Sequence, residues 1–160
     1  TAMNTILTTI DLPDGSTPDA IAITPDGSRA YVANFGNDTV TVIETAMNTI
    51  LTTIDLPDDS DPGAIAITPD GSRAYVATVG VDDSVIVINT ETNMIMETIS
   101  LSGDLQPFDI AISPDGSRVY TANANADSIT VTDTSSNTII GSLPTGNTPV
   151  GIAITPILLF

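Results

Sequence analysis

The sequence predicts an all-β fold, a β-propeller built from repeated four-stranded antiparallel blades of about 44 residues. Three observations support this prediction. Residues 1–14 recur unchanged at 45–58, and residues 20–33 recur unchanged at 64–77. Each repeat consists of short β-branched runs separated by turn residues, which is typical of strands and hairpins. No apolar pattern of helical period persists along the chain, so helices are not expected.

Two prolines in each repeat fix the period. The first series is Pro18, Pro62, Pro107 and Pro149, and the second is Pro25, Pro69, Pro114 and Pro156. Both series have intervals of 44, 45 and 42 residues, so insertions and deletions fall in the loops between these anchors. We therefore predict one domain over 1–160, with blade copies at 20–56, 64–101 and 109–143 and orphan edge strands at 5–12 and 151–160.

The elements of one repeat follow from its local sequence. Residues 21–24 form a short strand that ends at Pro-Asp-Gly-Ser, where Pro25 presets φ and Gly27 accepts a positive φ. Residues 29–34 return as the second strand, and residues 39–43 form the third after an Asn/Gly/Asp loop. Residues 48–56, rich in Thr and Ile, form a longer fourth strand. The first strands crowd the propeller axis, which favours small residues such as Ala22.

The second strands and the turns also have structural interpretations. We expect the repeated Tyr31, Tyr75 and Tyr120 to pack between adjacent blades, with each hydroxyl reaching a rim. We also expect Asp-Arg contacts between neighbouring turns, because an aspartate and an arginine flank each Gly-Ser pair. An anion site at these turns is the alternative.

The turn and second strand together carry a family resemblance. The segment Pro-Asp-Gly-Ser-Arg-Ala-Tyr-Val-Ala-Asn at 25–34, with variants at 69–78 and 114–123, resembles the YVTN family of β-propeller repeats. In the second copy Thr78 replaces the asparagine of the motif. The resemblance implies a surface-layer or extracytoplasmic protein, so we expect an extracellular or cell-surface location. The motif marks strands and turns and does not mark a functional site.

The number of blades in a closed ring stays open at this point. Three blades are complete, and the orphan strands could share a thin fourth blade in a monomeric ring. Two chains could instead pair into a ring of seven or eight blades, because unpaired strand edges favour self-association. The chain could also be a piece of a longer propeller or of a filament. We expect a homo-oligomer or filament formed by edge-strand pairing.

Composition excludes several kinds of chemistry. The chain has 20 acidic residues against 3 basic ones, a formal net charge of −17, and neither histidine nor cysteine. Nucleophiles built on histidine or cysteine, histidine-bound metals and disulfides are therefore excluded. Phosphate binding depends on Lys and Arg, so we expect no nucleic-acid partner. Apolar runs of four or five residues are too short to insert into a membrane.

The propeller topology gathers most of the acids on one face. The fourth-to-first and second-to-third strand loops share that face, whereas Arg29, Arg73 and Arg118 flank turns on the opposite face. We expect a cationic protein or a glycan to dock on the acidic face. Its candidate partner-binding residues are Asp14, Asp19, Asp38, Asp104 and Asp127. Closely spaced hard oxygen ligands also make Ca²⁺ a candidate ion, and no other cofactor is expected. The candidate calcium ligands are Asp58, Asp59, Asp61, Asp82 and Asp83.

These observations favour a non-enzymatic interaction and assembly scaffold outside the cytoplasm. The first alternative is a calcium-binding surface or adhesion module. The second is a propeller hydrolase, resembling a lactonase, that works through carboxylates. Acid-base catalysis needs a carboxyl group in a partly apolar pocket, and the sequence places its aspartates in loops that look solvated. We therefore expect no enzymatic activity.

Overall fold

The computed structural model describes residues 5–155 and contains three four-stranded antiparallel sheets. Blade 1 consists of β1 Pro18–Ile23, β2 Arg29–Asn34, β3 Thr39–Glu44 and β4 Thr49–Asp55. Blade 2 consists of β5 Pro62–Ile67, β6 Arg73–Thr78, β7 Ser84–Asn89 and β8 Met94–Ser100. Blade 3 consists of β9 Pro107–Ile112, β10 Arg118–Asn123, β11 Ser128–Asp133 and β12 Thr138–Pro144. A 3-10 turn, η1 Phe35–Asn37, lies between β2 and β3. The all-β propeller prediction is confirmed, and no helix among residues 5–155 is long and apolar enough to cross a membrane.

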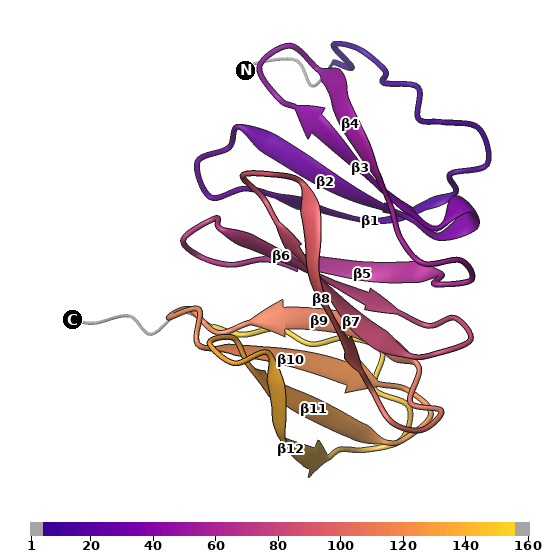
Figure 1. Cartoon of the computed structure of the whole chain (residues 1–160), viewed down its shortest axis with the longest axis vertical. Helices are drawn as coiled ribbons and strands as arrows, with labels where there is room; N and C mark the ends of the chain where they lie inside the picture. The colour runs from indigo at the N-terminus through magenta and orange to yellow at the C-terminus, as the bar shows by residue number, and fades with distance from the viewer. Residues whose placement is uncertain (1–4, 156–160) are drawn as a thin grey trace.

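The three blades follow one another with their first strands adjacent (Figure 1). Strand β5 contacts both β1 and β9, so these inner strands line one side of the molecule. Each blade starts two residues before its predicted boundary, at Pro18, Pro62 and Pro107. Proline has no N–H to donate to a sheet, and the first residue of a strand tolerates that loss.

The core lies between the sheets rather than within any one of them. Between blades 1 and 2, Tyr31, Val42 and Ile54 are buried in the same cluster as Val76 and Ile88. A second cluster fills the space between blades 2 and 3. In blade 2 the middle strands β6 and β7 are buried along nearly their whole length, so their sequences are continuous apolar runs and do not alternate.

The predicted orphan strands do not form within the described residues. Residues 5–12 and 151–155 have no strand, and 156–160 lie outside the described residues. A strand requires a hydrogen-bonded neighbour, and neither segment is paired with a described sheet. Ile10 and Leu12 nevertheless pack on blade 1. They are the repeat equivalents of Ile54 and Leu56, which are buried against blade 2.

Polar side chains clamp neighbouring blades at the rim that carries the first-to-second strand turns. The Arg29 guanidinium donates to the Thr90 carbonyl at 2.6 Å. The Tyr31 hydroxyl donates to the same carbonyl at 3.1 Å and to Asn93 Oδ1 at 2.7 Å. Burial raises the pKa of Tyr31, so the hydroxyl keeps its proton and remains a donor. The prediction that these tyrosines pack between blades is therefore confirmed for Tyr31.

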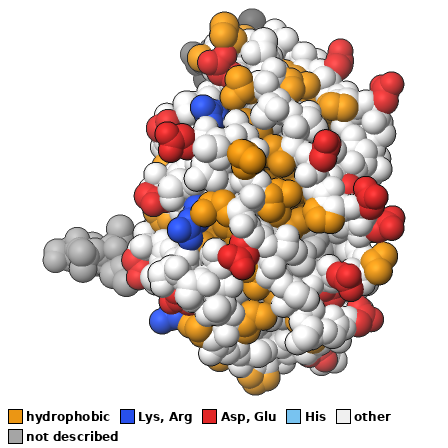
Figure 2. Space-filling model, viewed as in Figure 1, with side chains coloured by type: hydrophobic (Ala, Val, Ile, Leu, Met, Phe, Trp, Pro, Cys, Tyr) orange, Lys and Arg blue, Asp and Glu red, His pale blue; other side chains and the backbone are white. Residues whose placement is uncertain are grey.

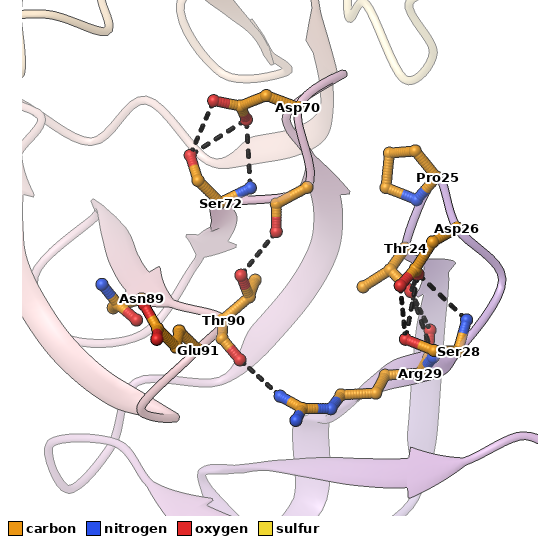
Figure 3. A pocket seen from close by; sticks show the side chains of 11 residues that line it. Thr24, Pro25, Asp26, Ser28, Arg29, Asp70, Ser72, Asn89, Thr90 and Glu91 are labelled. Carbon is orange, nitrogen blue, oxygen red and sulfur yellow. Dashed lines mark hydrogen bonds between the residues drawn. The ribbon is translucent and has the colours of Figure 1, made fainter.

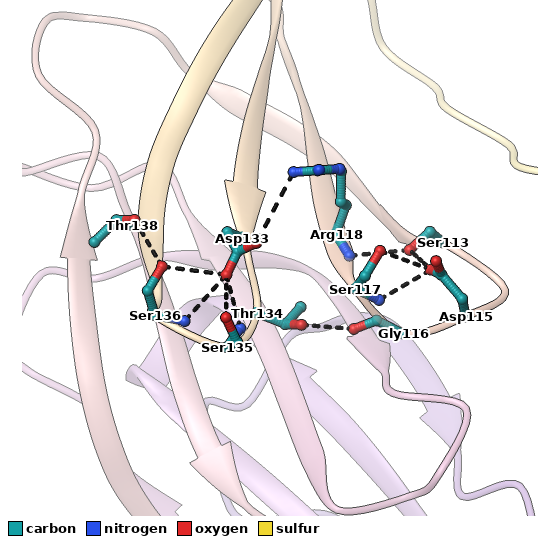
Figure 4. A network of polar contacts seen from close by, with 10 residues as sticks. All are labelled: Ser113, Asp115, Gly116, Ser117, Arg118, Asp133, Thr134, Ser135, Ser136 and Thr138. Atoms are coloured by element: carbon teal, nitrogen blue, oxygen red, sulfur yellow. Dashed lines mark hydrogen bonds and ion pairs between the residues drawn. The ribbon is translucent and has the colours of Figure 1, made fainter.

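The clamp recurs between blades 2 and 3. Arg73 donates to the Thr134 carbonyl at 2.6 Å, and the Tyr75 hydroxyl donates to Asn137 Oδ1 at 3.1 Å. On blade 3 Arg118 Nη1 is buried without a hydrogen-bond partner among the described residues. Its nearest acid is Asp133, with 3.9 Å between Arg118 Nη1 and Asp133 Oδ2 (Figure 4). Both of those side chains are partly exposed, so the ion pair contributes little.

We expect Tyr31→Phe to lower the free energy of unfolding by about 1–2 kcal/mol, because a buried carbonyl and an amide oxygen lose a donor. Tyr120→Phe is the matched control, because within residues 5–155 no blade follows blade 3 to supply the kind of partner that Tyr31 has. Urea denaturation followed by circular dichroism measures both changes. Equal losses for the two variants would contradict the clamp.

Candidate functional site

Two faces of the molecule are candidates for a site. The turn face carries the first-to-second strand turns, residues 24–28, 68–72 and 113–117, with the third-to-fourth strand turns. The loop face carries the second-to-third strand loops, residues 35–38, 79–83 and 124–127, with the linkers 56–61, 101–106 and 145–148 between blades. Figure 2 shows Arg side chains along one edge only, whereas acidic side chains lie along both that edge and the opposite one.

On the turn face a groove of about 460 Å³ lies between blades 1 and 2 (Figure 3). Asp26 accepts from the Thr24 hydroxyl at 2.6 Å and from the Ser28 amide at 3.0 Å, within its own turn. Arg29 binds the Thr90 carbonyl. The predicted Asp-Arg contacts between neighbouring turns are therefore wrong, because both groups have nearer partners. A similar groove of about 450 Å³ lies between blades 2 and 3, so these grooves belong to the repeat.

The turn aspartates make the folding stability of the protein depend on pH in the acid range. Hydrogen bonds from Thr24 and Ser28 lower the pKa of Asp26 to about 2, and those from Ser113 and Ser117 lower the pKa of Asp115 to about 2. A lowered carboxyl pKa contributes stability above the unfolded value of 3.8, and that stability is lost as pH falls through about 2.

We expect the Asp26→Asn/Asp115→Asn variant to lose less stability than the parent between about pH 4 and pH 2, because neither turn then takes up a proton on unfolding. Melting temperatures measured across that range test this. Asp14→Asn, which removes one carboxylate outside these turns, is the control. Parallel curves for the parent and the double variant would contradict the expectation.

On the loop face, aspartates in the second-to-third strand loops hold the linkers. Asp38 accepts from the amides of Asp59 at 2.9 Å and Asp61 at 2.8 Å. Asp83, a buried residue, accepts from the amides of Leu105 at 2.6 Å and Gln106 at 2.9 Å. Asp38, a predicted partner-binding residue, and Asp83, a predicted calcium ligand, thus have structural partners.

Asp127 is the third loop aspartate that binds a linker, since it accepts from the Thr148 amide at 2.7 Å. We call Asp38, Asp83 and Asp127 the latch residues, and their hydrogen bonds to the linkers the latches. Asp61 and Gln106 precede the strand-initiating Pro62 and Pro107, and Thr148 precedes the repeat-equivalent Pro149; all three have φ near +50°. This backbone conformation is strained for residues other than glycine and persists only where neighbours fix it. The latches therefore determine how each linker presents its last side chain to the loop face.

The predicted calcium ligands fall into two neighbouring segments. The amides of Val81 and Val79 donate to the carbonyls of Asp59 and Asp61, at 3.1 and 3.2 Å, so the two segments lie side by side. The remaining candidates are Asp58, Asp82 and Asp83. Within residues 5–155, no three acidic side chains come close enough together to hold a metal ion. Calcium binding stays a prediction.

Near the inner strands, the loop face has a pocket of about 310 Å³ lined by residues from all three blades. Its lining residues are Asp19, Phe35, Gly63, Val79, Gln106 and Phe108. Phe35 and Phe108 expose 39% and 55% of their surface, so aromatic faces are open to a ligand. The pocket combines a mainly apolar wall with one carboxylate and one carboxamide, as small-molecule sites do.

Asp19 is the carboxylate of this pocket. It is exposed, and its Oδ2 lies 3.7 Å from the position that a Cβ on residue 63 would occupy. Gly63 therefore leaves the space beside the carboxylate open. Asp109, also near the start of an inner strand, accepts from the Ile110 and Ile152 amides, both at 2.8 Å, and is held by them. Asp19 makes no such hydrogen bond within the described part of the chain.

The pocket lies where the repeats differ. The residue after the strand-initiating proline is Asp19 in blade 1, Gly63 in blade 2 and Phe108 in blade 3. Of the lining residues, only Asp19 was predicted as a site residue. The others were missed because attention to repeated motifs selects the residues that build blades. Divergence at equivalent positions was the available signal.

Comparison with known proteins places these features in a family. The family model "Lactonase, 7-bladed beta-propeller" matches residues 1–149. No significant match exists among curated proteins. Hydrazine synthase from Kuenenia stuttgartiensis is 29% identical, with a TM-score of 0.78 over 91% of this chain and 41% of that one.

Two solved structures described as putative 6-phosphogluconolactonases also share the fold. The Bacteroides uniformis protein is 24% identical, with a TM-score of 0.75 over 87% of this chain and 44% of that one. The Bacteroides fragilis protein is 23% identical, with the same TM-score over 87% and 42%. The chain thus spans less than half the length of these structural neighbours.

These matches correct the functional prediction. The expectation of a non-enzymatic surface scaffold is contradicted by the family match, and the hydrolase alternative is better supported. The loop aspartates were expected in polar, solvated surroundings; Asp19 is exposed, but it lines a pocket with two phenylalanines. Because the family model covers residues 1–149, this chain belongs to the lactonase family of seven-bladed β-propellers.

Proposed function

We propose that this chain supplies three blades and a substrate pocket of a propeller that hydrolyses lactones. Family membership supports the reaction class. The observation that carries the placement is the Asp19 carboxylate, which lies in a pocket with two exposed aromatic rings and open space over Gly63.

The lining residues have chemical roles suited to ester hydrolysis. Asp19 accepts a proton from a water molecule as that water attacks the lactone carbonyl carbon. The Gln106 carboxamide N–H donates to the carbonyl oxygen as negative charge develops on it. The ring C–O bond then breaks, and the departing ring oxygen takes up the proton held by Asp19. One water is consumed, and the product is an open-chain hydroxy acid.

Asp19→Asn tests this proposal. We expect lactone hydrolysis to fall by about 10²- to 10⁴-fold, because an amide cannot accept the proton. The melting temperature should stay unchanged, since Asp19 is exposed. Asp14→Asn, a change of equal charge outside the pocket, should retain the parental rate. A pH-indicator assay measures the acid released. A parental rate in the Asp19 variant would rule out this site.

The YVTN-type classification and the extracytoplasmic location remain expectations based on the repeat motif at 25–34. Self-association and a cationic or glycan partner likewise stay predictions. The acidic loop face supports a cationic partner, because its negative charge complements a positively charged surface.

A further inference from the structure

We infer that the loop-face pocket selects an uncharged, hydroxylated lactone and discriminates against phosphorylated ones. That the ligand is a lactone rests on the proposed function, whereas the preference for an uncharged ligand follows from the residues around the pocket. Two structural neighbours are described as putative 6-phosphogluconolactonases, whose substrate carries a phosphate, so the inference predicts a difference between those proteins and this one.

The basic residues of the chain are directed away from this pocket. Arg29, Arg73 and Arg118 are the whole basic complement, and all three begin the second strands at the turn face. Arg29 and Arg73 donate to the carbonyls of Thr90 and Thr134. Recognition of a phosphate group relies on Arg, Lys or converging backbone amides. No basic side chain lines the pocket.

The charged group of the pocket is negative instead, and further carboxylates lie on the same face. Asp19 is part of its wall, and the latch residues Asp38 and Asp83 lie on the same face. Asp83 also binds the amide of Gln106, so a fixed carboxylate lies just behind a pocket residue. A phosphate dianion in the pocket would be repelled by the Asp19 carboxylate, and repulsion between charges a few ångströms apart is substantial near a protein surface.

The lining suits the two kinds of surface that a neutral sugar-like ring presents. Phe35, Phe108 and Val79 offer apolar area for the C–H faces of a ring. The Asp19 carboxylate accepts from hydroxyl groups, and the Gln106 carboxamide both donates and accepts. A pocket of about 310 Å³ is near the lower limit for small-molecule sites and is suited to a single ring.

The experiment separates binding from hydrolysis by using stable analogues. Calorimetry on the 160-residue chain compares 1,5-gluconolactam with its 6-phosphate, and hydrolysis assays compare the corresponding lactones. At low salt we expect the neutral lactam to bind at least about tenfold more tightly than the phosphate. Raising the salt concentration should narrow this ratio, because screening weakens the repulsion.

Phe108→Lys supplies a cation at the pocket and should shift the preference toward the phosphorylated analogue. Val150→Lys, at the equivalent position after Pro149 and outside the pocket lining, adds the same charge and is the control. If Phe108→Lys unfolds the chain, the salt dependence of the parent protein alone decides the question. Tighter binding of the phosphate, equal binding of both analogues, or binding of neither overturns the inference. Preferential binding of the neutral lactam without lactone hydrolysis supports the preference for an uncharged ligand and overturns the proposed activity.

Discussion

Ile88→Ala is expected to lower the free energy of unfolding by about 2–5 kcal/mol. Ile88 is fully buried in the cluster between blades 1 and 2, where Val42 and Ile54 come from one blade and Val76 from the other. Truncation removes apolar contacts and leaves a cavity that two rigid sheets cannot easily close.

Ile95→Ala is the matched control, because Ile95 pairs with Ile88 across β7 and β8 but is 37% exposed. Its cost should be clearly smaller. Urea denaturation should show one cooperative transition for the parent chain, since the clusters join the blades. Similar losses for the two variants would contradict a core that lies between the sheets.

Thr78→Asn is the second large effect, although asparagine is the natural residue at this position in the other two blades. In blade 1 the buried Asn34 amide donates to Thr39 and Thr41, at 2.9 and 2.8 Å. In blade 2 the position equivalent to Thr41 is Ile86, whose side chain has no hydrogen-bond acceptor. The introduced amide would therefore be buried without its second acceptor, at a cost of about 1–3 kcal/mol.

A double-mutant cycle with Ile86→Thr tests this explanation. Ile86→Thr alone removes a buried apolar side chain. In combination with Thr78→Asn it restores the acceptor, so we expect the two changes to be less destabilising together than the sum of the single changes. Additive losses would show that the amide finds no partner in the new threonine. Chemical denaturation of the four proteins provides the measurement.

Much of the fold could be predicted because each element has a local cause. The Pro-Asp-Gly-Ser turns, the β-branched strands and the period of about 44 residues together define a four-stranded blade. The substitution of Thr78 for asparagine, by contrast, appeared only as a departure from a motif. The Thr78 hydroxyl lies 2.7 Å from Ser84 Oγ, and this partner is recognisable only once the register of β6 and β7 is known.

The site was less accessible to sequence reasoning. Asp19 was predicted among the acids of the loop face, but its aromatic neighbours come from other blades. Phe35 and Phe108 are 73 positions apart, and a repeat period alone does not show which loop residues converge. Asp38 and Asp83 were predicted as partner or metal residues, yet they bind backbone amides of the linkers. A count of acids cannot distinguish a carboxylate that is available to a ligand from one already bound within the protein.

The clamps and latches together fix the angle between neighbouring blades, and therefore the curvature of the row of blades. Arg29 and Tyr31 fix blade 2 against blade 1 at the turn face, and Asp38 fixes the start of blade 2 at the loop face. Two attachments at opposite ends of a sheet define the angle between neighbouring sheets. A three-blade sector therefore carries its own arc, independent of ring closure, and its superposition on less than half of larger propellers agrees with this.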